Sequence, residues 1–218
     1  MKLYPRFIAT CIATWLVGLA SSTLAQVSEI RVLDQKGQGV PNVVVYITAP
    51  DAPVRPLQKA HVVDQVDQAF APHISIMPVG SQAVFLNSDP VAHHVYSFSR
   101  PNDFVLPLFK GEVPEPVTLA HAGYVTMGCN IHDDMVGYIA VVESNSYGLT
   151  DADGRITLPM PQGIQFADAR IRIWSPRLRE RAVALVKPVT TTPVVFQLQK
   201  KLKRAHRSVQ GKALWNNY

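Results

Sequence analysis

The most restrictive feature of the sequence is its alternation between short β-branched runs and prolines. The chain has 17 prolines in 218 residues, and most of them fall between runs rich in valine, isoleucine and aromatic residues. Proline interrupts helices and central strands alike, so each run has to be a short element of its own. No segment shows a convincing amphipathic helical period. The pattern predicts an all-β chain of many short strands, as in β-sandwiches.

The predicted strands are the β-branched or alternating runs at 42–47, 82–86, 94–98, 123–127, 136–142, 155–158, 169–174 and 193–198. A loop with the sequence CNIHDDM, residues 129–135, separates two of these strands. Its donor residues are therefore expected to gather in one turn at a strand end.

The first 25 residues have the three parts of a secretory signal peptide. Lys2 and Arg6 form a basic start, 7–20 is almost wholly apolar, and 21–25 is a stretch of small residues that predicts cleavage after Ala25. The alternative is an uncleaved membrane anchor, for which the apolar run is short. No other stretch approaches the length of a membrane span.

Only two cysteines occur, and one of them, Cys11, lies inside the predicted signal peptide. Cleavage would leave Cys129 as the only thiol, so a disulfide within one chain is excluded. A lone cysteine in an oxidising compartment is expected to be buried, reactive or bound to metal.

The net charge of +5 is unevenly distributed. Subtracting two charges in the signal peptide and six in the tail leaves −3 for the residues between them. The six tail residues are Lys200, Lys201, Lys203, Arg204, Arg207 and Lys212. The tail, 200–218, is either a solvated, partly disordered segment or a docking arm for an acidic partner or a membrane surface. Nucleic acid is not an expected partner of an exported protein.

Cys129, His132 and Met135 together form a donor set that suits copper. Thiolate and thioether sulfur hold Cu(I), imidazole suits Cu(II), and a trigonal His₂Cys set with a weak axial Met is a type 1 electron-transfer site. Zinc fits less well because of the methionine. Taken singly, each residue also has a plainer interpretation, as a core thiol, a turn residue and core filler.

A second histidine is available at His93 or His94, and around it the sequence resembles the cupredoxins. The resemblance rests on QAFAP at 68–72, VGSQAVFLNSD at 79–89, and the short Cys–His–Met spacing also seen in amicyanin. It is closest to cupredoxin-like proteins labelled methylamine-utilisation proteins, through HHVYSFS at 93–99 and GCNIHDDMVGYIAV at 128–141. This resemblance implies a Greek-key β-sandwich over 60–143 with one type 1 copper.

The same resemblance implies a ligand set of His93, Cys129, His132 and Met135. His94 stands where the family usually has asparagine. It would hold the two ligand loops together by hydrogen bonds, or be the ligand in place of His93. The remaining histidines are expected to be structural or on the surface; they are His61, His73, His121 and His206.

A second resemblance flanks the first. Residues 29–47 and 150–163 resemble the opening and later strands of the carboxypeptidase-regulatory-like β-sandwich, each with an Asp-x-x-Gly turn. We therefore expect the cupredoxin domain to be inserted into, or flanked by, a small sandwich made of 27–59 and 144–199. The alternative is one continuous domain.

No nucleophile triad, paired-carboxylate motif or phosphate loop is present, so an enzyme is not expected. The resemblance implies a periplasmic protein that carries single electrons between redox partner proteins. The electron would leave through the exposed edge of His132. An apolar docking patch is expected from Ile131, Met135 and either Phe104 or Phe109. The two alternatives are a periplasmic copper carrier or chaperone, and an extracytoplasmic binding or scaffold module.

Overall fold

The computed structural model describes residues 27–179, 184–190 and 192–204. The predicted signal peptide and the tail beyond residue 204 lie outside the described residues. Within them the regular elements are strands and one 3₁₀ turn, η1 (Phe166–Asp168), which confirms the all-β fold class. None of the described segments forms an apolar helix of membrane-spanning length.

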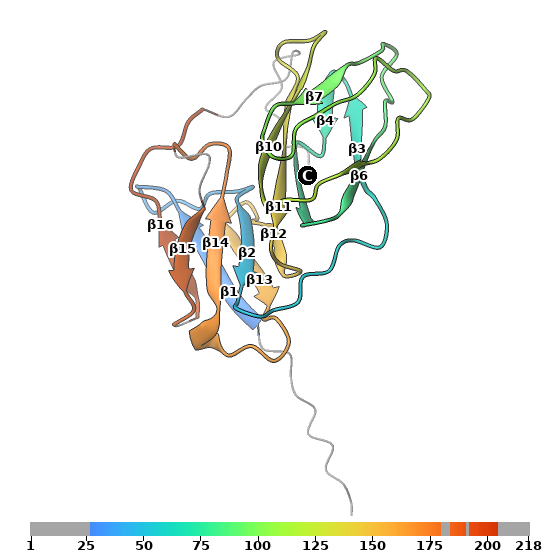
Figure 1. Ribbon diagram of the computed structural model, residues 1–218. Coiled ribbons are helices and arrows are strands. Elements are labelled where there is room, and N and C mark those ends of the chain that lie inside the picture. The colour runs from blue at the N-terminus through green and yellow to red at the C-terminus, as the bar shows by residue number, and fades with distance from the viewer. Residues whose placement is uncertain (1–26, 180–183, 191, 205–218) are drawn as a thin grey trace, which may run out of the picture.

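Strands from the two ends of the described chain pair with each other in what we call the flanking sandwich. One sheet has the order β13-β1-β16 and the other β12-β2-β14-β15. Their bounds are β1 (Val27–Leu33), β2 (Val44–Thr48), β12 (Tyr147–Leu149), β13 (Arg155–Pro159), β14 (Arg170–Trp174), β15 (Leu185–Pro188) and β16 (Val194–Gln197). Figure 1 shows these blue and orange-red strands side by side, although about a hundred residues separate them in sequence.

The intervening residues form a second pair of sheets, the central sandwich. Its sheets have the orders β5-β11-β10-β7-β8 and β4-β3-β6-β9. Their bounds are β3 (His61–Val66), β4 (Ala69–Ala71), β5 (Ile74–Pro78), β6 (Gln82–Phe85), β7 (Val95–Ser97), β8 (Phe104–Val105), β9 (Val117–Thr118), β10 (Gly123–Cys129) and β11 (Val136–Val142). β5 runs parallel to β11 and β3 runs parallel to β6, whereas β10 and β11 are antiparallel.

The two sandwiches stack through a third, shared core. Successive residues of β2 point to opposite sides, so Val45 and Ile47 enter the core of the flanking sandwich while Val44 and Tyr46 face the central one. The side chains of β11 alternate in the same way: Ile139 enters the core of the central sandwich, and Tyr138 and Ala140 enter the shared core. A strand buried on both faces needs a nearly continuous apolar sequence, which explains the runs VVVYI and VGYIAVV.

Aromatic rings fill the shared core. Tyr124 of β10 stacks on Trp174 of β14 with ring centroids 4.3 Å apart and planes 2° apart. Its hydroxyl lies 2.9 Å from that of Tyr46, and Tyr138 meets Trp174 edge-on. The two sandwiches are thus joined by well-packed rings as well as by two chain crossings.

Two Asp-x-x-Gly turns in the flanking sandwich have the same geometry. Asp34 Oδ1 accepts hydrogen bonds from the backbone N–H groups two and four residues on, at 2.8 and 2.9 Å, and Asp151 Oδ1 does the same at 2.9 and 2.8 Å. Gly37 and Gly154 each have a positive φ, of 80° and 73°. Only glycine adopts this conformation without strain, so both turns follow directly from the sequence.

Each predicted strand occurs, with ends shifted by at most two residues. The prediction missed several strands, among them β3, β5 and β15. The structure keeps the strands of 61–142 in sheets separate from those of 27–48 and 147–197. The assignment of the flanking part to a carboxypeptidase-regulatory-like domain, and the domain limits, stay predictions.

Candidate metal centre

His93 is held on a fixed stretch of backbone just before β7. Its backbone N–H donates to Phe109 O at 3.1 Å, and its carbonyl accepts from Phe109 N at 3.0 Å. The Asn87 side chain reinforces this bridge by donating from Nδ2 to the carbonyls of Val91 and Phe109. The His93 side chain is completely buried, so its orientation is set by the surrounding fold.

Cys129 is the last residue of β10, and the loop after it closes tightly. The Cys129 N–H donates to Met135 O at 3.2 Å, and the Met135 N–H donates to His132 O at 2.9 Å. These two hydrogen bonds fold the loop back onto the end of β10, which brings the His132 side chain next to that of Cys129. Cys129 Sγ and His132 Nδ1 thus lie 4.0 Å apart, and the gathering of all three loop donors, Met135 included, stays a prediction.

The three donor atoms of His93, Cys129 and His132 lie within 4.8 Å of one another, and we call them the His–Cys–His cluster. Cys129 Sγ is 3.6 Å from His93 Nδ1 and 4.0 Å from His132 Nδ1. Sulfur and nitrogen ligands bound to one ion at roughly 2.0–2.3 Å lie about 3.5–3.8 Å apart. The spacing and the donor types therefore fit a single metal ion between the three side chains.

A buried carboxylate orients one of the imidazoles. Asp89 Oδ2 is 2.8 Å from His93 Nε2, and the Asp89 side chain is 5% exposed. It also accepts from the backbone N–H of Gln68 at 2.9 Å, which fixes its position. With Nε2–H donating to Asp89, the Nδ1 lone pair faces the cluster and is ready to bind a metal. Asp89 received no role among the predictions from the sequence, because a four-residue spacing brings side chains together in a helix and this segment is not helical.

His94 is half-buried and lies outside the His–Cys–His cluster. Its backbone carbonyl accepts a hydrogen bond from Asn130 N at 3.0 Å, which links the His93 segment to the Cys129 loop. The backbone therefore joins the two loops at this position, and a role for the His94 side chain stays a prediction.

Met135 is 1% exposed and packs in the same core as Cys129. Its backbone N–H and C=O groups both make hydrogen bonds within the loop, to His132 O and from Cys129 N. Its place as an axial ligand stays a prediction from the sequence.

The expected docking patch is partly wrong. Met135 and Phe109 are buried and Phe104 is half-buried within the core of the central sandwich, so they offer little surface to a partner. Ile131 is 52% exposed beside His132 and is the one member of that set with a largely open side chain. Met135 turns inward because its backbone bonds close the loop over the end of the core, whereas Phe104 packs on Phe85 with ring centroids 5.4 Å apart.

The other histidines in the described part of the chain lie away from the cluster. His61 Nε2 bonds Ser75 Oγ at 3.0 Å, and burial lowers the pKa of His61. His73 is buried and meets the Tyr138 ring edge-on, and His121 is exposed on a backbone hydrogen-bonded to Asn102. His206 lies outside the described residues.

Comparison with known proteins gives structural neighbours only. No family model matches the chain, and no curated protein matches it. Among solved structures, a reduced Cu(I) form of an amicyanin mutant at pH 4 is similar at 21% identity, with a TM-score of 0.36 over 44% of this chain and 99% of that chain. A reduced form of another amicyanin mutant is similar at 22% identity, with the same TM-score and coverage. The all-β layers and the His–Cys–His cluster described above stand independently of these likenesses.

Proposed function

We propose that this protein is an exported type 1 copper protein of the cupredoxin kind that carries single electrons between redox partner proteins. The ligands in this proposal are His93, Cys129, His132 and Met135. The observation that carries it is the convergence of two imidazole Nδ1 atoms on the buried Cys129 Sγ, at 3.6 and 4.0 Å.

Burial of the donors favours electron transfer over substrate chemistry. Cys129 is 3% exposed and His93 is 0% exposed, and both are held by strand ends on a packed core. A cluster closed off in this way leaves little room for a substrate to reach the metal position. Bound copper would supply the one-electron cycle between Cu(I) and Cu(II).

The chain's own residues would keep the ligand geometry constant through such a cycle. Asp89 holds the His93 ring by Nε2, the Asn130–His94 bond joins the two ligand segments, and the loop bonds to Met135 fix the Cys129 end. Apolar packing around the Cys129 sulfur excludes water and raises the potential of a copper–thiolate site. The ring edge of His132, which is half-buried next to exposed Ile131, is the proposed route for the electron.

The test is the visible spectrum of residues 26–218 after one equivalent of Cu(II). We expect an intense blue thiolate-to-copper band that ascorbate bleaches and that Cys129→Ser abolishes. His121→Ala is the matched control, since His121 is exposed and outside the cluster, and it is expected to leave the band unchanged. A colourless protein that binds Cu(I) and passes it to an apo-protein would instead favour a copper carrier. Absence of copper binding would contradict the proposal.

A further inference from the structure

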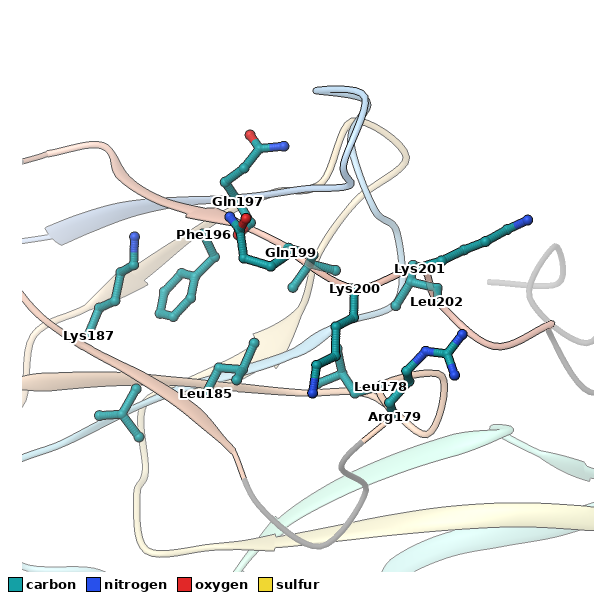
Figure 2. Close-up of a pocket in the computed structure, with 12 residues that line it drawn as sticks. Leu178, Arg179, Leu185, Lys187, Phe196, Gln197, Gln199, Lys200, Lys201 and Leu202 are labelled. Atoms are coloured by element: carbon teal, nitrogen blue, oxygen red, sulfur yellow. The ribbon is translucent and has the colours of Figure 1, made fainter.

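A groove opens along one side of the flanking sandwich, between the edge strands of its two sheets. β15 is the edge of one sheet and β16 is the edge of the other. The groove has a volume of about 320 Å³ and continues along the segment 197–202 after β16. Figure 2 shows its lining side chains between the two chain segments. It belongs to the sandwich that does not carry the metal ligands, so nothing proposed here depends on copper.

The floor of the groove is apolar. Leu178, Phe196 and Leu198 line it and are each less than a tenth exposed. The β15 side adds Leu185 and Val186, which are 38% and 44% exposed. Pockets that bind small molecules have this composition, an apolar surface with few polar groups that fix orientation.

Cations surround this apolar floor. Arg179, Lys187, Lys200 and Lys201 line the groove, and no acidic residue is among its described lining residues. Lys187 Nζ is fixed at one end, where it donates to Val195 O at 2.7 Å and lies 5.3 Å from the centre of the Phe196 ring. In Figure 2 Lys200 points toward Leu178 and Leu185, whereas Lys201 points away from them. The neighbouring groove, by contrast, includes Asp34.

The segment after β16, which forms one wall of the groove, is held in place by hydrogen bonds. Leu198 N donates to Leu33 O at 2.8 Å, Lys203 N donates to Arg177 O at 2.8 Å, and Arg177 Nε donates to Lys203 O at 3.1 Å. The first residues of the predicted basic tail are therefore part of the flanking sandwich. The groove is formed by ordered structure on both sides.

We propose that this groove binds a single-chain amphiphilic anion, a fatty acid monomer. The alkyl chain would lie on Leu178, Phe196 and Leu198, and the carboxylate would lie near Lys200 and Arg179, at the end of the groove away from Lys187. A small inorganic anion would leave the apolar floor unused, and a neutral apolar ligand would leave the cations without a counterion.

The first experiment is calorimetric titration of residues 26–218 with dodecanoate below its micelle concentration. We expect one site per chain. Decanoate is expected to bind roughly fifteenfold more weakly, because it lacks two methylenes and each buried methylene contributes about fourfold in affinity. 1-Dodecanol is expected to bind at least tenfold more weakly than dodecanoate, because it has no charge for the cations to meet.

The second experiment changes the groove. Arg179→Glu with Lys200→Glu reverses two exposed lining cations at the proposed head-group end, and Lys59→Glu with Arg100→Glu makes the same charge change at exposed positions of other segments. We expect at least tenfold weaker dodecanoate binding for the first pair and less than twofold change for the second. If the first pair does not fold, the head-group and chain-length comparison on the unaltered chain decides.

Several results would overturn the proposal. Absence of dodecanoate binding is one, and equal binding of dodecanol and dodecanoate is another. Equal loss in both charge-reversed pairs would show a general charge effect. Binding to vesicles of anionic phospholipid without binding of monomeric dodecanoate would assign the cations to a membrane surface instead.

Discussion

The two sandwiches use their aspartates in different ways. In the flanking sandwich, Asp34 and Asp151 bond the backbone N–H groups of their own turns. In the central sandwich, Asp89 is buried and bonds the side chain of His93. The first arrangement shapes the chain locally, while the second positions a group that can do chemistry. The same residue type thus marks architecture in one region and a candidate site in the other.

The difference lies in what each carboxylate would leave behind if it were removed. Loss of a turn aspartate exposes backbone groups that water can reach. Loss of Asp89 leaves a buried imidazole N–H without its acceptor, which is the more costly case for a polar group. Loss of a turn aspartate is therefore expected to weaken its own turn, whereas loss of Asp89 is expected to affect both stability and the orientation of the His93 ring.

The largest effect is expected where the two sandwiches meet. Trp174→Ala removes a ring that is 1% exposed and stacked on Tyr124, so the free energy of unfolding is expected to fall by about 3–5 kcal/mol. Urea unfolding followed by far-ultraviolet circular dichroism measures it. Trp174→Phe keeps a ring in place and is expected to lose less. A loss below about 1 kcal/mol for the alanine variant would show that the shared core contributes little and that the two sandwiches are energetically separate.

The two matching turns of the flanking sandwich are expected to tolerate alanine very differently. A Cβ at Gly154 would lie 2.3 Å from Val32 O in addition to the strain of a positive φ, and we expect a loss of about 2–4 kcal/mol. A Cβ at Gly37 would meet nothing within 4 Å, so only the backbone strain of about 1–2 kcal/mol remains. Equal losses in Gly154→Ala and Gly37→Ala, measured by urea unfolding, would contradict this assignment.

The sequence was sufficient for much of this architecture because its signals are local. Val136–Val142 is a strand with the predicted ends, and both Asp-x-x-Gly turns form from short-range bonds of their own residues. β3 and β5 were missed because they take parallel partners from later segments of the chain, β6 and β11. β15 pairs with β14, the strand before it, and was missed because it is an exposed edge with little apolar pattern. Strand pairing across about a hundred residues leaves no local trace.

At the candidate site, too, features with a local sequence signal were predicted and features that depend on tertiary contacts were not. The CNIHDDM loop and the His93 segment were recognisable from donor types and spacing. The role of Asp89 was not, because only the fold shows that its carboxylate meets His93 Nε2 and Gln68 N. The burial of Met135 and Phe109, which limits the docking patch, likewise depends on how the loop packs over the core.

Asp89→Asn is expected to lower metal affinity without a large change in fold, a prediction that rests on the proposed function. The amide oxygen can still accept from His93 Nε2, but it lacks the negative charge and is a weaker acceptor than the carboxylate. Changing the hydrogen-bond partner of a metal-binding histidine typically costs 10–100-fold in affinity. Copper titration against a competing chelator measures the change. Asp64→Asn is the matched control, because Asp64 bonds Ser88 and backbone N–H groups in the same sandwich without touching His93. Equal loss of affinity in both variants would assign the effect to general weakening of the sandwich.

The smallest expected effect is a pH dependence at the shared core. Burial, reinforced by the neighbouring Tyr46, raises the pKa of Tyr124 well above its usual value of 10.0. Above about pH 10 the unfolded chain releases this proton while the folded chain retains it. The stabilising contribution is therefore complete below pH 10, and the free energy of unfolding falls as the pH rises further.

Tyr124→Phe separates this effect from the ring packing. The variant keeps the stack on Trp174 but loses the hydroxyl pair with Tyr46, so we expect a loss of about 0.5–1.5 kcal/mol at pH 8. Between pH 8 and pH 10.5 its unfolding free energy is expected to fall less than that of the parent chain, because one buried phenol no longer resists ionisation. Urea unfolding at the two pH values measures the difference, and lysine titration is common to both proteins and cancels. Parallel pH dependence in the two chains would mean that Tyr124 ionises as readily folded as unfolded, and that the contact between the sandwiches opens to water at high pH.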